Sequence, residues 1–494
     1  MTGRGSPGHP SRRRFLATAG VGLAGALAGC GYRPGGGDLA WESSLGGGGM
    51  FGAGDRWFRP AGDRLFVVRN QSGRTFDFEE DAWRDYENAE VTGLDPAGDA
   101  RLEAETDRQA TGVPAVTETS VFVPVEGGRV TAIDRERAAL DLDDPTVDTA
   151  DSDGDEADEP DPVRWRTDAV AESADGGTGD DDGATDDDDG ATDDDDGATD
   201  DDDGATDDDD GATDDDDGAT GDAPAVTVDA VRAGGRLAVA VTRDDAVVLD
   251  AGSGDRAFAV AEAWPDAGDG SPRSLSPDRV AVDGDAVWVA VDEGDSGGAR
   301  IARFDAAGER SATRSLEAGV DWLTVVDDAV VVAADGGPSV RGFDRDLGPR
   351  FALDVPAPNE RPPVGGASGD DAATSGGDDA GRRVYLHRGE VVRALDVAAG
   401  EVAWEHAGLP ASRPTAVDDR GIYGVGEDSG GDGVEPGPAL VAVGADGDGR
   451  WSAPLPEGVR VEELFAVGGR LIAVDGEDLY GFRAEPGERW SLLG

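Results

Sequence analysis

Short apolar runs of four to six residues alternate with turns rich in Gly and Asp along most of the chain. Representative runs lie at 121–125, 237–241 and 287–291, and each is followed by a second run that ends in an apolar-Asp pair before the next turn. The helical spacing of apolar residues at i, i+3 and i+4 is nearly absent. This pattern predicts an all-β chain built from short strands.

The pattern recurs as a repeat that begins after the first sixty residues. Equivalent aspartates are 39 residues apart between Asp95 and Asp134, and again between Asp305 and Asp344. Eight such units can be counted, and units of this length indicate four-stranded blades arranged around an axis. We therefore expect an eight-bladed β-propeller, with seven blades as the alternative. A short strand around Trp41 is expected to complete the last blade and close the ring.

Two segments interrupt the repeat. Residues 137–222 form an acidic low-complexity insertion in which Asp-Asp-Asp-Asp-Gly-Ala-Thr recurs with a period of seven, and residues 357–381 form a loop rich in Gly, Ser and Asp. No position of the heptad is large and apolar, so it predicts no coiled coil. Because nothing in it offsets the entropy cost of ordering, the acidic insertion is expected to be disordered and extended by self-repulsion. We expect it to act as a tolerant loop or spacer that binds cations only weakly.

One unit carries a nearly complete motif, Leu-Asp-x-x-x-Gly-x-x-x-Trp, which contains Asp396, Gly400 and Trp404. It resembles the repeats of the pyrroloquinoline-quinone-type (PQQ-like) β-propellers, and the resemblance covers about residues 40 to 490. The family implies that tryptophans pack between blades; in this chain these are Trp41, Trp404, Trp451 and Trp490. Quinone-dependent enzymes of the family use a neighbouring pair of cysteines and a compact calcium site, whereas Cys30 is the only cysteine here. Quinone binding is therefore not expected, and no cofactor is predicted.

The first thirty residues combine an export signal with an anchor. Arg12 and Arg13, followed by Phe15 and Leu16, match the twin-arginine export signal, whose cargo is exported folded. The apolar stretch after it is too short for a helix that spans a bilayer. It ends in Leu-Ala-Gly-Cys, which resembles the lipobox of lipoproteins and makes Cys30 the expected site of lipid attachment. The alternative is an Arg-rich start followed by a short buried helix.

These features divide the chain into three parts. A signal peptide is expected at 1–29, a Gly-rich tether at 30–38 and the propeller at 39–494. The mature protein is expected at the cell surface, held by its lipid on the outer face of the cytoplasmic membrane.

The composition is strongly acidic. The formal net charge is −64, with 107 acidic and 43 basic residues, and every basic residue is Arg. Nucleic acid is not an expected partner, because phosphate binding needs local positive charge. The Asp-rich, Lys-free composition resembles proteins of extreme halophiles, particularly halophilic archaea; an acidic protein of a GC-rich bacterium is the alternative. High salt would screen the self-repulsion that opposes the compact state.

The sequence offers no catalytic or metal-binding constellation. Outside the leader the only histidines are His387 and His406, which do not have metal-ligand spacing. The carboxylates of 151–156 alternate as in calcium loops, but Glu156 stands where such a loop needs Gly, so a solvated linker is expected. Asn70 begins the N-glycosylation tripeptide Asn-Gln-Ser in a predicted blade turn. We therefore predict no catalytic, cofactor or metal residue, and Asn70 is the candidate glycosylation site.

Two functions are compatible with these features. The first is a non-enzymatic surface lipoprotein whose propeller binds or scaffolds a protein or envelope component; outer-membrane assembly lipoproteins with the same propeller are a parallel at the level of the fold. The second is an extracellular enzyme or sugar-binding protein that uses Asp or Glu carboxylates at the central mouth of the propeller. The lining of the central channel discriminates between them, since small residues favour the scaffold, whereas carboxylates, arginines and aromatics in one pocket favour the second function.

Overall fold

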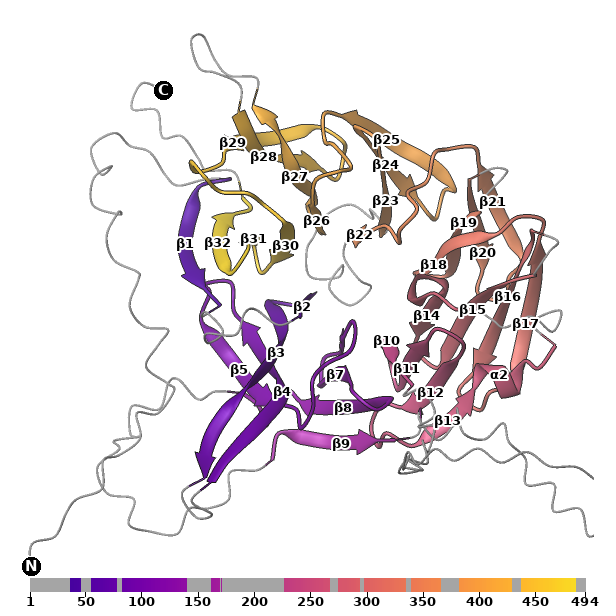
Figure 1. The fold of residues 1–494 in the computed structure, drawn as a ribbon. Coiled ribbons are helices and arrows are strands. Elements are labelled where there is room, and N and C mark those ends of the chain that lie inside the picture. Colours follow the sequence, from indigo (N-terminus) through magenta and orange to yellow (C-terminus); the bar gives the residue numbers. More distant parts are fainter. Residues whose placement is uncertain are drawn as a thin grey trace, which may run out of the picture.

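The computed structural model describes residues 36–45, 55–77, 82–139, 161–168, 170, 226–266, 274–293, 297–334, 339–365, 382–428 and 437–485. The strands form eight four-stranded sheets arranged as blades around a central axis (Figure 1). The prediction of an eight-bladed all-β propeller is confirmed, and the seven-bladed alternative is wrong. Within the described residues, helix is limited to α2 (Val260–Ala263), the single turn η2 (Pro277–Arg279) and Val170.

The blades are numbered in chain order, and each is given from its innermost to its outermost strand. Blade 1 contains β2 (Arg56–Ala61), β3 (Arg64–Asp77), β4 (Ala82–Leu94) and β5 (Ala100–Glu105); blade 2 contains β6 (Ala115–Val116), β7 (Ser120–Val125), β8 (Arg129–Asp134) and β9 (Val163–Thr167). Blade 3 contains β10 (Val228–Gly234), β11 (Leu237–Thr242), β12 (Ala246–Asp250) and β13 (Arg256–Ala259); blade 4 contains β14 (Val280–Asp283), β15 (Ala286–Asp292), β16 (Ala299–Asp305) and β17 (Arg310–Leu316). Blade 5 contains β18 (Val320–Val326), β19 (Ala329–Ala334), β20 (Val340–Asp344) and β21 (Pro349–Leu353); blade 6 contains β22 (Val364–Gly365), β23 (Arg383–Arg388), β24 (Val391–Asp396) and β25 (Glu401–Ala407). Blade 7 contains β26 (Thr415–Asp418), β27 (Gly421–Asp428), β28 (Gly437–Gly444) and β29 (Gly449–Pro454); blade 8 contains β30 (Glu463–Val467), β31 (Arg470–Asp475), β32 (Asp478–Arg483) and β1 (Leu39–Ser44).

The ring is closed by the first described strand. β1 pairs antiparallel with β32, from Leu39 opposite Phe482 to Ser44 opposite Asp478. The inner strand of blade 8, β30, contacts the inner strand of blade 1, β2. The predicted strand around Trp41 therefore completes blade 8 and joins the two ends of the propeller (Figure 1). Closure leaves no blade without a neighbour, which removes the open edge that a partial ring would present.

The predicted boundaries of the two insertions are wrong. Residues 163–167, inside the predicted 137–222 insertion, form β9, because Val163 and Trp165 pair with β8 and give this short stretch an apolar side within the acidic sequence. Residues 364–365, inside the predicted 357–381 loop, form β22. The acidic heptads and the signal peptide lie outside the described residues. Among the residues that are described, no helix is long and apolar enough to span a membrane.

Residues paired across the four strands of a blade form a row that runs from the axis to the rim. On the third strand this row position is Ala or Gly in six of the eight blades; these residues are Gly93, Ala132, Gly342, Ala394, Ala442 and Gly481. Where the outer strand carries an aromatic residue at the paired position, its ring lies across the third strand and excludes a larger side chain there. A Cβ on Gly342 would lie 2.1 Å from Cε1 of Phe351, and one on Gly481 would lie 2.1 Å from Cε2 of Trp41.

The outer-strand ring of one blade packs on a turn glycine of the next, and we call these contacts the aromatic belt. They join Trp41 to Gly98, Trp165 to Gly254, Phe258 to Gly308, Phe351 to Gly400, Trp404 to Gly447 and Trp451 to Gly37. The φ angles of these glycines lie between +69° and +91°, a conformation that disfavours any residue with a Cβ. Each of the four indoles also donates its Nε1–H to a backbone carbonyl of the neighbouring blade, at 2.7–3.1 Å. Inter-blade packing is confirmed for Trp41, Trp404 and Trp451, while Trp490 lies outside the described residues.

Two blade interfaces depart from the belt. Between blades 1 and 2 the outer-strand position holds Leu102, and between blades 4 and 5 it holds Ala312. In blade 4 the large ring has moved to the second strand, where Trp288 is fully buried and donates Nε1–H to the carbonyl of Arg345 at 3.3 Å. Leu347, with φ +63°, occupies the turn position that is Gly in the six belt contacts, and its side chain packs in the same cluster as Trp288. In blade 4, therefore, the large ring of the row is on the second strand and the small residue is on the outer strand.

The apolar-Asp pair at the end of the third strand shapes the turn that follows. Asp305 Oδ1 accepts hydrogen bonds from the backbone N–H groups two and four residues on, at 2.9 Å each. Asp95 and Asp344 accept equivalent bonds. This is the local bonding for which Asp is favoured in turns. Blade 8 has Arg483 at this position and needs no such turn, because its fourth strand comes from the other end of the chain.

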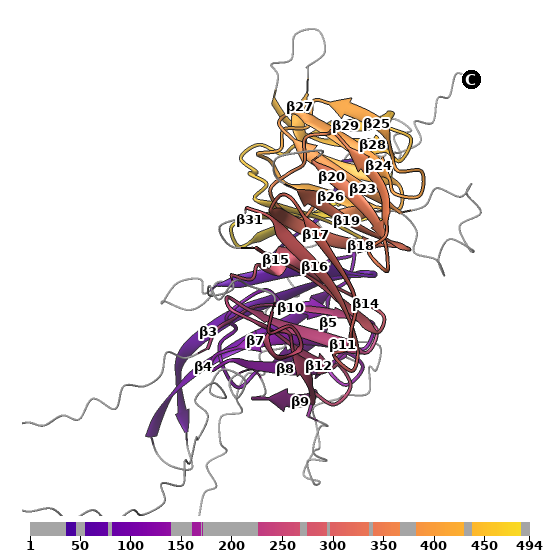
Figure 2. The ribbon, with the colours of Figure 1, turned by 90° about the vertical axis from the view of Figure 1, so that its right-hand side faces the viewer.

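The β3–β4 hairpin projects beyond blade 1 (Figure 1, Figure 2). Its neighbours β2 and β5 stop pairing with it at Arg69 and Glu90, so the outer part of the hairpin is a two-stranded ribbon. Its main ring contact joins Phe76 and Trp83 edge to face, with centroids 5.4 Å apart. Trp83 is nevertheless 60% exposed, whereas in the belt Phe258 is buried and the other rings are half-buried.

Candidate functional site: an arginine cluster in the central channel

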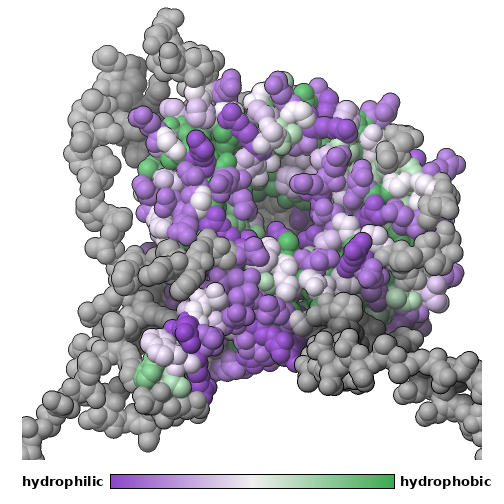
Figure 3. All heavy atoms as spheres, in the orientation of Figure 1, coloured by the Kyte–Doolittle hydropathy of each residue, from purple (hydrophilic) through white to green (hydrophobic). Residues whose placement is uncertain are grey.

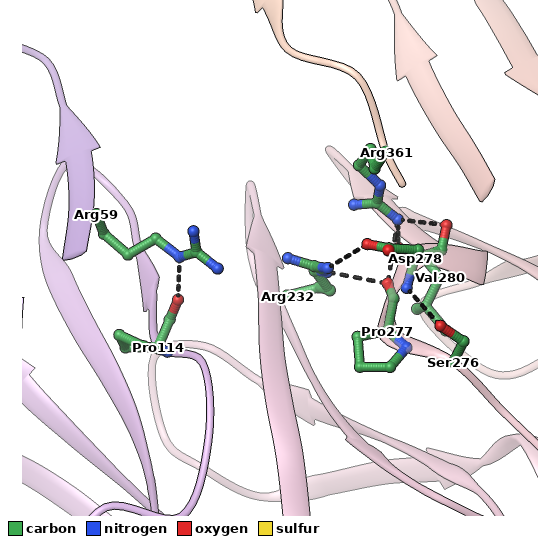
Figure 4. Close-up of polar contacts among 8 residues, drawn as sticks. All are labelled: Arg59, Pro114, Arg232, Ser276, Pro277, Asp278, Val280 and Arg361. Atoms are coloured by element: carbon green, nitrogen blue, oxygen red, sulfur yellow. Dashed lines mark hydrogen bonds and ion pairs between the residues drawn. The ribbon is translucent and has the colours of Figure 1, made fainter. Parts of the chain in front are cut away.

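Three arginine side chains from separate parts of the ring point toward one another (Figure 4). Arg59 lies on the inner strand of blade 1, and Arg232 lies on the inner strand of blade 3. Arg361 lies in the segment that leads from blade 5 to blade 6 and reaches back to η2 of blade 4. Figure 3 shows the ring hollowed at its centre, and in Figure 4 the guanidinium group of Arg59 faces the other two across open space. We call these three residues the arginine cluster.

Backbone carbonyl oxygens of η2 hold two members of the cluster side by side. Nε of Arg232 and Nη2 of Arg361 both donate to the carbonyl of Pro277, each at 3.1 Å. Nη2 of Arg361 also donates to the carbonyls of Asp278 and Val280, at 2.9 and 2.6 Å. The two guanidinium groups are thus fixed by η2 and by the first residue of β14, both in blade 4.

The cluster keeps hydrogen-bond donors that the described chain leaves unused. Arg59 donates from Nε to the carbonyl of Pro114 at 2.9 Å, and among described residues its terminal nitrogens have no hydrogen-bond partner. Nε of Arg361 is enclosed and likewise lacks a partner within the described part of the chain. An unsatisfied buried donor costs about 1–3 kcal/mol, and more when the group is charged. The arrangement is therefore costly for the protein alone.

The surroundings also disfavour the positive charges. Burial, followed by the charge of Arg232, lowers the pKa of Arg361 to about 9, and the same two causes lower the pKa of Arg59 to about 10. Burial also lowers the pKa of Arg232. A bound anion would favour the charged forms and act against these shifts.

Two carboxylates accompany the cluster. Oδ1 of Asp278 lies 3.3 Å from Nη2 of Arg232. Glu463 lies on the inner strand of blade 8, on the opposite side of the ring from blade 4. Burial raises the pKa of Glu463, and the charges of Arg56 and Arg59 act against that rise. The three arginines of the cluster are therefore accompanied by two carboxylates. Asp278 is paired with Arg232, and burial disfavours the ionised form of Glu463.

Most other blades place small or apolar residues at the inner end of the row. These are Ala115, Ala281, Thr324, Ala416 and Phe465. Ala115, Ala281, Thr324 and Ala416 are buried, so among these inner row positions the charged residues are Arg59 and Arg232.

The residues predicted from the sequence do not meet in this site. The export and lipid positions Arg12, Arg13, Phe15, Leu16 and Cys30 lie outside the described residues, as does the 151–156 loop. His387 and His406 lie two strands apart in blade 6, and a ring nitrogen of each contacts a backbone carbonyl, at 2.7 and 3.3 Å. In the described ranges no group of three or more His, Cys, Asp or Glu side chains is arranged to hold a metal ion.

Asn70 lies inside β3, so its predicted position in a blade turn is wrong. The strand continues through this region because Gly73 leaves room for the ring of Tyr86 on the paired strand. Nδ2 of Asn70 donates to the carbonyl of Ala110 at 2.9 Å, and the N–H of Ala110 donates to Oδ1 at 2.7 Å. The amide thus ties the projecting hairpin to the loop before blade 2. Glycosylation of Asn70 stays a prediction, which intact-mass measurement of the mature protein would test.

Sequence reasoning missed the arginine cluster, although two of its members share a signal. Arg59 pairs with Phe66 and Arg232 pairs with Val239, in each case two residues in from the pair that flanks the first hairpin turn. A charged residue at the same point of two apolar inner strands indicates a common environment at the axis. Arg361 gives no such signal, because it lies in the predicted 357–381 loop.

No protein-family model and no curated protein matches this chain. Among solved structures, the quinohemoprotein alcohol dehydrogenase of Comamonas testosteroni is similar, with 12% identity, coverage of 92% of this chain and 78% of that chain, and a TM-score of 0.44. A chain of the mitotic checkpoint complex has 11% identity, coverage of 76% and 90%, and a TM-score of 0.38. The computationally designed Ika8 protein has 9% identity, coverage of 88% and 95%, and a TM-score of 0.32. Likenesses this low carry no argument about function, and the eight-bladed propeller rests on this chain's own strand pairing.

Proposed function

We propose that this protein is a non-enzymatic binding module, tethered by a lipid to the outer face of the cytoplasmic membrane, with its binding site in the central channel. The observation that carries the proposal is the arginine cluster, whose members come from separate blades and keep unused donors. Groups that are costly to the fold yet converge on one solvent-facing place are characteristic of functional sites. The binding site is therefore placed in the channel rather than on the outer loops.

The position of the first described residues supports a short tether. Gly36 lies at the seam between blades 7 and 8, where a Cβ on it would be 2.4 Å from Nε1 of Trp451. The six residue-to-residue steps from Cys30 to Gly36 span at most about 20 Å when fully extended. A lipid on Cys30 would thus hold the rim at blades 7 and 8 close to the membrane surface.

Cell fractionation tests export and tethering in a host with twin-arginine transport. The Cys30→Ser variant is expected to leave the membrane fraction, and the Arg12→Lys/Arg13→Lys variant is expected to stay inside the cell. Persistence of Cys30→Ser in the membrane fraction would contradict the lipid anchor. The halophile interpretation predicts a melting temperature that rises between about 0.1 and 3 M KCl, as screening weakens self-repulsion.

Mass spectrometry of small molecules released from the purified protein tests the binding site. Wild type is compared with Arg59→Gln/Arg361→Gln, and Arg74→Gln on the exposed hairpin serves as the control. We expect a ligand that wild type and control retain and the channel variant loses. Equal retention by all three proteins would contradict a binding site in the channel.

The alternative, an extracellular enzyme, has one observation in its favour, namely the raised pKa of Glu463 beside Arg59. A raised pKa makes a carboxyl better suited to general acid catalysis. Glu463→Gln distinguishes the two functions, because an enzyme would lose turnover of the released ligand, whereas a binding module would keep the ligand unchanged.

A further inference from the structure

The unused donors of the arginine cluster indicate the chemistry of the ligand. We propose that the central channel binds a small multivalent oxyanion, a molecule with two or more carboxylate or phosphate groups, between Arg59 on one side and Arg232 with Arg361 on the other. This inference rests on the proposed function, since it names the ligand class of the same site.

The donor geometry fits oxyanions. A guanidinium group is a planar fork of N–H donors that matches the paired oxygens of a carboxylate or phosphate. Both terminal nitrogens of Arg59 are free of hydrogen bonds to described residues. Arg232 donates to residues of η2 from Nε and Nη2. Arg361 donates to backbone carbonyls of the same region from Nη2. Nη1 of each arginine is therefore left for the ligand. Because the carbonyls of η2 already fix these two side chains, little conformational entropy is lost on binding.

The charge around the cluster calls for more than one anionic group. Arginines elsewhere in the ring are commonly paired with surface carboxylates, as in the Arg310–Asp266 and Arg350–Asp328 contacts at 2.9 and 2.7 Å. Arg59 and Arg361 have no such salt bridge among the described residues, although the chain holds 107 acidic residues. A monoanion could satisfy one fork, whereas a ligand with two or three anionic groups could engage both sides of the channel.

Isothermal titration calorimetry on the full chain tests the ligand class. Citrate is the carboxylate probe, pyrophosphate is the phosphate probe, and acetate is the monovalent control. The titrations are made in about 2 M KCl, where the Debye length is only about 2–3 Å and non-specific attraction to surface arginines is screened. We expect saturable one-to-one binding of citrate or pyrophosphate, at least about tenfold tighter than acetate, because bidentate contacts add for each anionic group. Which probe binds more tightly distinguishes a polycarboxylate from a phosphate ligand.

Variants locate the binding. Arg59→Gln and Arg361→Gln are each expected to weaken binding about tenfold or more, whereas Arg74→Gln on the hairpin leaves it unchanged. Arg59→Lys keeps the charge and loses the fork, so an intermediate loss is expected. Unchanged far-ultraviolet circular dichroism and melting temperature show that each variant is folded. If folding of Arg361→Gln fails, the Arg59 pair of variants still decides the test.

Two results would overturn the inference. One is that neither citrate nor pyrophosphate binds saturably to wild type. The other is that a polyanion binds, but neither Arg59→Gln nor Arg361→Gln weakens its binding. If both polyanions fail while the channel still retains another ligand from the cell, the ligand class is wrong and the proposed function stands. If the channel variants keep that cellular ligand, the proposed function itself fails.

Discussion

The aromatic belt lies at the rim of the blades and the arginine cluster lies at the axis, and the two follow opposite rules. In blade 3, one row runs from Arg232 at the axis through Val239 and Val248 to Phe258 at the rim. At the rim, rings pack against glycines and every belt indole has an acceptor. At the axis, like charges crowd together and donors lack partners. The rim is arranged for stability, and the axis gives up stability in the way that functional sites commonly do.

The largest expected effect is the loss of a belt residue. Trp404→Ala removes a ring packed on Gly447 and an indole donor to the carbonyl of Ala445, so we expect a loss of about 3–5 kcal/mol in the free energy of unfolding. Trp83→Ala makes the same chemical change on the hairpin, where the ring is 60% exposed, and is expected to stay within about 0.5 kcal/mol of wild type. Urea unfolding in high salt measures both. Equal losses would show that the belt does not differ energetically from an exposed ring.

The reversed row of blade 4 sharpens the rule for the belt. Ala312→Trp adds a second large ring to a row that Trp288 already fills, so we expect overpacking that costs about 1–3 kcal/mol. The triple variant Trp288→Ala/Ala312→Trp/Leu347→Gly rebuilds the common arrangement and is expected to recover part of this loss. Further destabilisation of the triple variant, measured by the same urea unfolding, would mean that the belt arrangement does not transfer between blades.

The belt was largely predictable from the sequence, and the cluster was not. Belt residues obey a local spacing, in which Gly400 follows Asp396 by four positions and Trp404 follows Gly400 by four. Phe258 and Phe351 fill the same role, but the motif specifies Trp and so does not identify them. Trp165 was not identified because it lies within the predicted acidic insertion.

Members of the arginine cluster have no such spacing. Arg59 and Arg361 are separated by 302 positions, and only closure of the ring brings them to one place. The hydrogen bonds that hold Arg361 come from η2, a turn whose carbonyl directions depend on the position of blade 4. Local pattern therefore reveals what each blade repeats, whereas the contents of the channel depend on how all eight blades are assembled.

Substitution of an arginine of the cluster is expected to change the free energy of unfolding in the opposite direction from substitution of a belt residue. Arg59→Met removes a desolvated charge that makes one described hydrogen bond and is repelled by Arg232, so we expect stability to stay equal or rise by up to about 2 kcal/mol while oxyanion binding is lost. Burial and the charge of Arg232 lower the pKa of Arg59 to about 10 in the folded protein, so the unfolded chain binds more protons in the pH window between about 10 and the higher pKa of the unfolded chain. Wild type should therefore gain stability from this group as pH rises through that window, and Arg59→Met should lack the gain. Urea unfolding at about pH 8 and pH 11 measures both effects, and a loss comparable to that of Trp404→Ala would contradict the comparison.

The smallest effect concerns Asp418, at the end of inner strand β26, which accepts the O–H of Tyr423 at 3.0 Å on Oδ2. Burial raises the pKa of Asp418, while hydrogen bonds from the Arg420 N–H and from Tyr423 act against the rise. The folded pKa thus lies above the unfolded value of about 3.9, so the carboxyl contributes most below that pH and its contribution is lost as pH rises through the folded pKa. Asp418→Asn keeps an acceptor without a charge and is expected to stabilise the protein at pH 7 by less than about 1 kcal/mol, with no gain near pH 3. A gain in stability of equal size at both pH values, measured by thermal unfolding, would assign the effect to packing. Packing rather than charge would then decide stability at this inner strand, as it does at the rim.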